Sequence, residues 1–201
     1  MGLARKLIQI AKIRELRNSI FFVLGVLVIF RFAAHIPLPG VNRENLESFF
    51  SSNEIFGLVN IFSGGALESF SIVALGIAPY ITASIIFQLL QMVVPRFEEL
   101  SKEGESGRKK LNQYTRLATV PLAAVQGFGL IRLLQGHSAA VIAPDLPMFD
   151  FISMLVILTS GTIFLMWLGE LISERKIGNG ISILIFAGIV AGIPTSLQTF
   201  I

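Results

Sequence analysis

Five long apolar stretches limit how this chain can fold more than any other feature of its sequence. A helix needs about 20 residues to cross the hydrocarbon core of a bilayer, within a range of roughly 17 to 25. Only 14% of the 201 residues are charged, whereas soluble domains usually carry about 25%. We therefore predict an all-α membrane protein with five spans, at 20–36, 72–94, 117–134, 151–169 and 181–201.

Lysine and arginine residues are concentrated on one predicted side of the membrane. They occur in the N-terminal tail, in the loop 95–116 after the second span, and after the fourth span as Arg175 and Lys176. The opposite side carries few, with Arg43 and Arg132 among them. An excess of these residues marks the cytoplasmic side. We therefore expect the N-terminus in the cytoplasm, and five spans would place the C-terminal end outside.

The N-terminal segment 1–19 combines basic residues with apolar residues at helical spacing. Such a pattern predicts an amphipathic helix on the inner membrane surface. A basic region before an apolar one is also typical of a signal peptide, but no small-residue cleavage site follows. An uncleaved anchor is therefore favoured for the first span. Cysteine is absent, so no disulfide framework is expected.

A glycine pair, Gly64 and Gly65, interrupts the chain before the second span, and Pro79 lies inside that apolar run. Proline removes an amide donor and tends to kink a helix. Irregular backbone at membrane depth is tolerated only where protein covers it or where it lines water. A broken helix leading into a kinked one can therefore line a pore, although a loop packed against the bundle fits the same pattern.

The predicted spans contain few groups that could carry chemistry. Glu170 and Glu174 stand four residues apart, but basic residues follow at once, which favours a solvated helix end over acid–base work. His35 and His137 lack the spacing of a metal site, and no nucleophile–base pair is recognisable. We expect no enzyme activity, no metal and no cofactor. Polar residues within the spans are by default hydrogen-bonded between helices; they are Thr82, Ser84, Gln88, Gln126, Thr159, Ser160 and Thr162.

Two pairs of isoleucines stand four residues apart, so each pair shares one helix face. They are Ile77 with Ile81 in the second span, and Ile181 with Ile185 in the fifth. Such pairs also arise by chance in an isoleucine-rich chain. The residues alone therefore leave these side chains as facing either the lipid or the core.

Four blocks of the sequence resemble the SecY family, the central subunits of protein-conducting channels. The family's plug and second span are similar to FSGGALESFSIVALGIAPYITASI, and its next cytoplasmic loop is similar to KEGESGRKKLNQYTR. The end of its first span resembles FRFAAHIPLPG, and its fourth and fifth spans resemble GTIFLMWLGELISERKIGNGISILIFAGIVAGIP. These blocks follow in the family's order over well over half the chain. The resemblance implies the N-terminal five-helix half of an inverted-repeat bundle of ten spans.

The resemblance also implies roles for individual residues. A hydrophobic pore ring would consist of Ile77, Ile81, Ile181 and Ile185, whose branched side chains form a seal that resists ions. A re-entrant plug at about 55–70 would rest against this ring on the outer side, with its centre at Phe62, Ser63, Gly64, Gly65, Ala66 and Leu67. Thr82 and Gln126 would belong to a lateral gate. Cytoplasmic partners would contact Arg108, Lys109 and Lys110.

A member of this family would move unfolded secretory polypeptides across the cytoplasmic membrane and release membrane segments laterally into the phospholipid bilayer. The implied partners are SecE, SecG, the SecA motor or the ribosome, signal peptides and nascent polypeptides. Five spans cannot enclose the pore alone, so we expect a fragment that needs the C-terminal half of SecY, rather than a natural half completed by a second chain. A secondary transporter of a small solute, which also uses broken helices, is the main alternative, and an inert scaffold is another.

Overall fold

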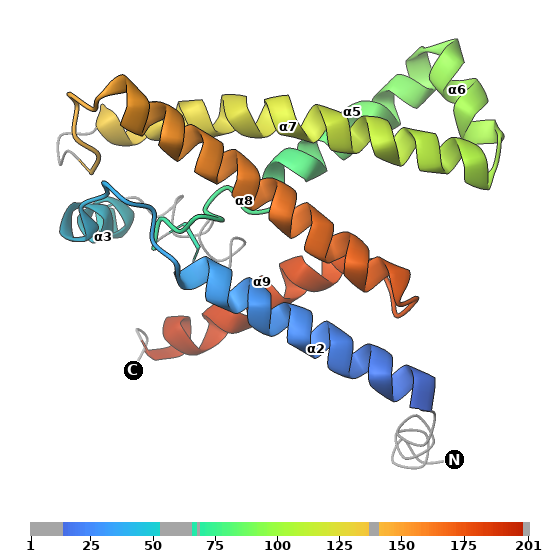
Figure 1. Ribbon diagram of the computed structural model, residues 1–201, viewed down its shortest axis with the longest axis horizontal. Coiled ribbons are helices and arrows are strands. Elements are labelled where there is room, and N and C mark those ends of the chain that lie inside the picture. The colour runs from blue at the N-terminus through green and yellow to red at the C-terminus, as the bar shows by residue number, and fades with distance from the viewer. Residues whose placement is uncertain (1–13, 53–65, 68, 137–140, 199–201) are drawn as a thin grey trace.

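The computed structural model describes residues 14–52, 66–67, 69–136 and 141–198. Across these ranges the fold is all-α, as predicted, and β-pairing occurs only as two isolated bridges. The helices, drawn in Figure 1, are α2 (Arg14–His35), α3 (Arg43–Ser52), α5 (Ala78–Val93), α6 (Pro95–Lys102), α7 (Glu105–Gln135), α8 (Met148–Glu174) and α9 (Gly180–Gln198).

Each of the five predicted spans overlaps one of these helices, although 72–77 of the second span forms turns. Three of them, α2, α7 and α8, are long and apolar enough to cross a membrane. The helices α5 and α6 pass the same test only as a pair, and they meet at a bend of 100°. Helix α9 contains a shorter apolar stretch, Gly180–Ala191. The chain is therefore a multi-pass membrane protein.

Pro79 and Pro95 lie at the starts of helices, which differs from the expected kink inside the second span. Pro79 lies in the first turn of α5, where a missing amide hydrogen leaves no hydrogen bond unmade. The chain forms turns over 72–77 before that helix begins. Pro95 likewise opens α6, and Val94 before it is extended, with φ −105° and ψ 113°. A residue that precedes proline is held out of the helical region, which explains the bend between α5 and α6.

The segment 95–116, expected as a loop, is mostly helical. It contains α6 and the first turns of α7, joined at Gly104 with a φ of +75°. The two helices approach closely at Gly107, where an added Cβ would lie 1.7 Å from the carbonyl oxygen of Leu100. Figure 1 shows α6 closing the far end of the α5–α7 pair. The glycines therefore allow a compact helical turn where sequence composition indicated only mixed charge.

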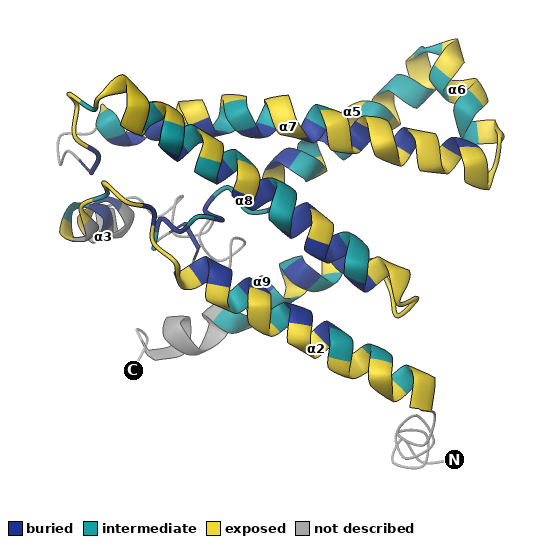
Figure 2. Cartoon of the chain, viewed as in Figure 1, coloured by how far each residue is buried: buried dark blue, intermediate teal, exposed yellow. Residues whose placement is uncertain are grey.

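The core lies around α8, which packs against α2, α5, α7 and α9. Its buried side chains extend from Met154 to Ile172, and Figure 2 shows buried positions along this helix and on the segment that leads to α5. Large apolar side chains are exposed on the outer faces, including Phe32 on α2 and Met92 on α5. This distribution is typical of a bundle whose outer surface faces lipid.

Candidate pore seal and gate

Three of the four isoleucines predicted for the pore ring line one hollow between helices. Ile77 and Ile81 of the second span meet Ile185 of α9 around a hollow of about 230 Å³. The remaining lining is apolar as well: Phe30, Ala74, Leu75, Gly76, Ala78, Leu165 and Leu184. Ile77 is buried, whereas 39% of Ile81 is exposed. The arrangement can exclude water and ions, because it offers no polar side chain to either.

Ile181, the fourth predicted member, lies one turn before Ile185 and packs in a different place. An added Cβ on Gly169 of α8 would lie 2.5 Å from the Cδ1 atom of Ile181. The side chain of Ile181 is partly buried against the core that contains Leu168 and Ile172. It therefore packs at the junction of α8 and α9 rather than lining the hollow.

The start of α9 is fixed by side-chain caps and by close backbone packing. The side-chain oxygen Oδ1 of Asn179 accepts hydrogen bonds from the amides of Ile181, at 3.0 Å, and Ser182, at 3.3 Å. This is the usual way to satisfy amides at a helix N-terminus. The amide of Gly180 donates to Ser173 Oγ at 2.8 Å, and an added Cβ there would lie 1.8 Å from the Gly169 carbonyl oxygen. The orientation of Ile185 follows from this junction.

Residues 66–67 and 69–77 position the other side of the hollow. Ala66, Phe70, Ser71 and Val73 are at most 1% exposed. The carbonyl of Ile72 approaches α8 so closely that an added Cβ on Gly161 would lie 1.9 Å from its oxygen. The segment ends at Ile77, the N-cap residue of α5, so the irregular backbone sets the position of both isoleucines of the second span.

The two predicted gate residues lie next to one another. The side-chain amide of Gln126 on α7 donates to Thr82 Oγ1 on α5 across 3.5 Å. That hydroxyl donates in turn to the carbonyl of Ala78 in its own helix, at 3.0 Å. Thr82 and Gln126 therefore form a polar contact between the two helices, and the contact is long for a hydrogen bond.

Another span residue, Thr162, is buried, and its hydroxyl has no hydrogen-bond partner within the described part of the chain.

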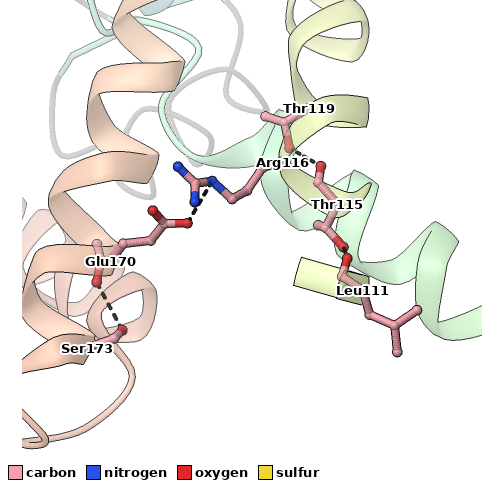
Figure 3. Close-up of polar contacts among 7 residues, drawn as sticks. Leu111, Thr115, Arg116, Thr119, Glu170 and Ser173 are labelled. Atoms are coloured by element: carbon pink, nitrogen blue, oxygen red, sulfur yellow. Dashed lines mark hydrogen bonds and ion pairs between the residues drawn. The ribbon is translucent and has the colours of Figure 1, made fainter. Parts of the chain in front are cut away.

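An ion pair that sequence reasoning missed joins α7 to α8. The Nε atom of Arg116 lies 3.0 Å from Oε1 of Glu170, as Figure 3 shows. The two side chains are 45% and 33% exposed, so Glu170, about one turn before the end of α8, is partly exposed and also paired with Arg116. The partners are far apart in the chain, and no local pattern could pair them. Nearby on α7, the hydroxyls of Thr115 and Thr119 donate to carbonyls of their own helix.

The basic residues predicted to contact partners lie at the exposed start of α7. Lys109 pairs with Glu105 at 3.6 Å, and Lys110 pairs with Glu103 at 3.3 Å. Arg108 is exposed, and no ion pair is formed by it among the described residues. On the neighbouring helix α6, a hydrogen bond from Lys102 holds the pKa of the Glu98 carboxyl below its ordinary value. Of the predicted trio, Arg108 thus retains the most available positive charge.

Two of the predicted regions lie partly outside the described residues. These include Phe62, Ser63, Gly64 and Gly65 of the plug, and residues 1–13 of the N-terminal amphipathic helix. The last two plug positions, Ala66 and Leu67, are described and buried. Residues 14–19 form the first turns of α2. Within the described ranges, no group of three or more His, Cys, Asp or Glu side chains could hold a metal ion.

Comparison with known protein families decides the assignment. The SecY family model matches residues 71–201, which include the gate pair, the ion pair and every residue that lines the hollow except Phe30. The chain belongs to the SecY family. Over 92% of its length it is 48% identical to the protein translocase subunit SecY of Streptomyces coelicolor. It is 51% identical to that of Vibrio cholerae over 91% of its length. The chain spans only 45% and 41% of these SecY relatives, less than half of each.

Proposed function

We propose that this chain forms the N-terminal half of a protein-conducting channel. The channel moves unfolded secretory polypeptides across the cytoplasmic membrane and releases membrane segments laterally into it. The observation that carries this proposal is the apolar hollow where Ile77 and Ile81 meet Ile185. The named activity of the SecY relatives supports it, because they are protein translocase subunits.

In the proposed channel, the isoleucines close the pore between translocation events. A constriction lined by branched apolar side chains expels water and so blocks ions, yet those side chains can rearrange around a passing chain. The plug, Phe62 to Leu67, would cover this ring from the outer side. The burial of Ala66 in the same core as Ile77 supports that position. Glycines at 64 and 65 would supply the backbone freedom that displacement of the plug requires.

Lateral release requires helices α5 and α7 to move apart when a signal sequence arrives. The Thr82–Gln126 contact is a single long hydrogen bond, and such bonds between membrane helices contribute only about 0.6 kcal/mol on average. A gate held by one such bond opens at low cost. A signal peptide with sufficient apolar surface could replace the helix contacts that are lost.

The distribution of basic residues supports an N-terminus in the cytoplasm, with Arg108, Lys109 and Lys110 on that side. These residues would contact the SecA motor or the ribosome, and Arg108 is the most available of them. A C-terminal half of SecY would supply the opposite wall of the pore, with SecE and SecG as further subunits. The lengths of the SecY relatives support the need for a second half, since this chain spans less than half of each.

The seal is tested by the double variant Ile81→Gly with Ile185→Gly in the complete channel complex. Removing both side chains widens the constriction, so ion conductance of the resting channel in planar bilayers should rise. The matched control is Ile86→Gly with Val190→Gly, on the same two helices, where both side chains are exposed. It carries the same cost in helix propensity and should leave conductance unchanged. Equal conductance in the two double variants would contradict the seal.

The secondary-transporter alternative is not supported. The hollow has no charged or polar side chain among its lining residues that could bind a small solute. The SecY relatives are named for protein translocation. The broken second span is accounted for equally well by a plug followed by a gate helix.

A further inference from the structure

The segment just before α5 is attached to the end of α2 by a pair of backbone hydrogen bonds. The amide of Leu38 donates to the carbonyl of Phe70 at 2.9 Å, and the amide of Ile72 donates to the carbonyl of Ile36 at 3.0 Å. These two bonds flank the antiparallel bridge between Pro37 and Ser71. The segment therefore pairs with the connection after α2 as a short piece of sheet.

Side-chain and packing contacts hold the same segment from two other directions. Ser69 Oγ donates to the carbonyl of Ala34 in the last turn of α2, at 2.9 Å. On the other side, Gly161 of α8 lies directly against the carbonyl of Ile72. Ser71 is fully buried, and its hydroxyl accepts a hydrogen bond from the amide of Val73. Moving this segment would break these backbone hydrogen bonds and expose side chains, such as Ser71 and Val73, that are now fully buried.

The connection from this segment to α5 is different in character. Gly76 has a φ of +58°, and no atom lies within 4 Å of the position where its Cβ would be. Glycine adopts this left-handed region at little cost. The chain thus passes from a tightly held segment to the helix that carries Ile81 and the gate residue Thr82 through one glycine, whose amide donates to the carbonyl of Val73 at 2.8 Å.

We propose that residues 69–73 are a fixed mount for the pore seal. They stay attached to α2 and α8 in both the closed and the open channel, and α5 moves relative to them at Gly76. Ile77 follows Gly76 as the N-cap of α5, so it turns with that helix, while the mount fixes the point about which Ile77 and Ile81 move. This inference rests on the proposed channel function, because it concerns which parts of the gate move.

A disulfide across the bridge tests the mount in the complete channel complex. The bonds around Pro37 and Ser71 make them a non-hydrogen-bonded antiparallel pair, whose Cα atoms lie about 4.5 Å apart. That separation falls within the range that a disulfide accepts, about 4.4 to 6.8 Å. This chain contains no cysteine, so Pro37→Cys with Ser71→Cys adds one defined pair once the other subunits are also freed of cysteine.

The expected result is rapid oxidation in the membrane and no loss of preprotein translocation into vesicles, compared with the same preparation under reductant. The control lock is Val41→Cys with Ile142→Cys, at the second isolated antiparallel bridge, which should also be tolerated. A loss of translocation on oxidation at 37 and 71 alone, restored by reductant, would overturn the mount. Failure of this pair to oxidise would overturn it too, because a fixed pair at this spacing reacts.

The outcome for the mount is separable from the outcome for the channel. If the cysteine-free complex translocates no preprotein under any condition, the proposed function fails. The oxidation yield of the pair would still report whether residues 37 and 71 remain together. Single-cysteine variants at each position show whether either substitution alone disturbs folding, measured as the amount of complex extracted from membranes.

Discussion

The contact between α8 and the mount gives a sharp test of the fold, through Gly161→Ala. The new Cβ would lie 1.9 Å from the carbonyl oxygen of Ile72 and 2.9 Å from its carbonyl carbon. Side-chain Cβ atoms essentially never come within 3.0 Å of another heavy atom, so the backbones must separate by about 1 Å. Both neighbours are backbone, which cannot rotate out of the way. Overpacking of this kind costs about 1–3 kcal/mol or more.

Helix propensity opposes this effect, because alanine is favoured over glycine in a helix by roughly 1 kcal/mol. Because both close contacts are to backbone, we expect the upper end of that range, a net loss of up to about 2 kcal/mol. For a protein of about 200 residues, each kcal/mol lowers the thermal midpoint by roughly 2–4 °C, so the midpoint of the detergent-solubilised complex should fall by several degrees.

Gly129→Ala is the matched control, since it lies within helix α7 and an added Cβ meets nothing within 4 Å. It should leave the midpoint unchanged or raise it slightly, through helix propensity alone. Thermal midpoints of the two variants are compared in the same detergent. Equal midpoints for Gly161→Ala and Gly129→Ala would refute the close approach of α8 to Ile72.

Two further predictions concern the backbone at Gly76 and the ion pair between Arg116 and Glu170. Gly76→Ala places a side chain in the left-handed backbone region, which costs about 1–2 kcal/mol. Gly76→Asn should cost less, because asparagine tolerates that region. Equal thermal midpoints for the two variants would contradict a strained backbone at Gly76. Arg116→Gln and Glu170→Gln should each destabilise by less than about 1 kcal/mol, because the pair is partly exposed. A double-mutant cycle on the two residues should give a coupling that shrinks at high salt, and a coupling independent of salt would contradict a direct ion pair.

The sequence predicted the helices well because length and hydropathy determine membrane spans with little help from tertiary structure. Each predicted span overlaps a helix, although 72–77 forms turns and α7 and α8 extend beyond their apolar cores. Apolar composition cannot locate those ends, because polar residues continue a helix past the membrane. Pro79 was predicted to kink a helix and instead begins one. The preceding turns are held by hydrogen bonds to Ile36 and Leu38, which no local pattern indicates.

Only some of the contacts in the candidate site could be predicted from the sequence. The family resemblance identified Thr82 and Gln126, and the structure places them in contact across two helices. From residue type alone, these two side chains were predicted only to form hydrogen bonds between helices. The Arg116–Glu170 pair escaped prediction, since basic neighbours of Glu170 in the sequence suggested a local explanation. Long-range partners of this kind depend on how α7 packs against α8, and spacing along the chain contains no information about that.

Within the proposed seal, the first and second isoleucines of each pair have different surroundings. In each pair the first isoleucine lies at the beginning of its helix, where the backbone is held: Ile77 is the buried N-cap of α5, and Ile181 packs on Gly169 below the Asn179 cap. The second lies one turn further on and lines the hollow, as Ile81 and Ile185 do. A side chain that must yield to a passing polypeptide needs free space, and Ile81 is 39% exposed whereas Ile77 is 8% exposed. In the proposed channel, closure of the pore would therefore depend mainly on Ile81 and Ile185, while Ile77, which also lines the hollow, and Ile181 would hold the starts of the two helices.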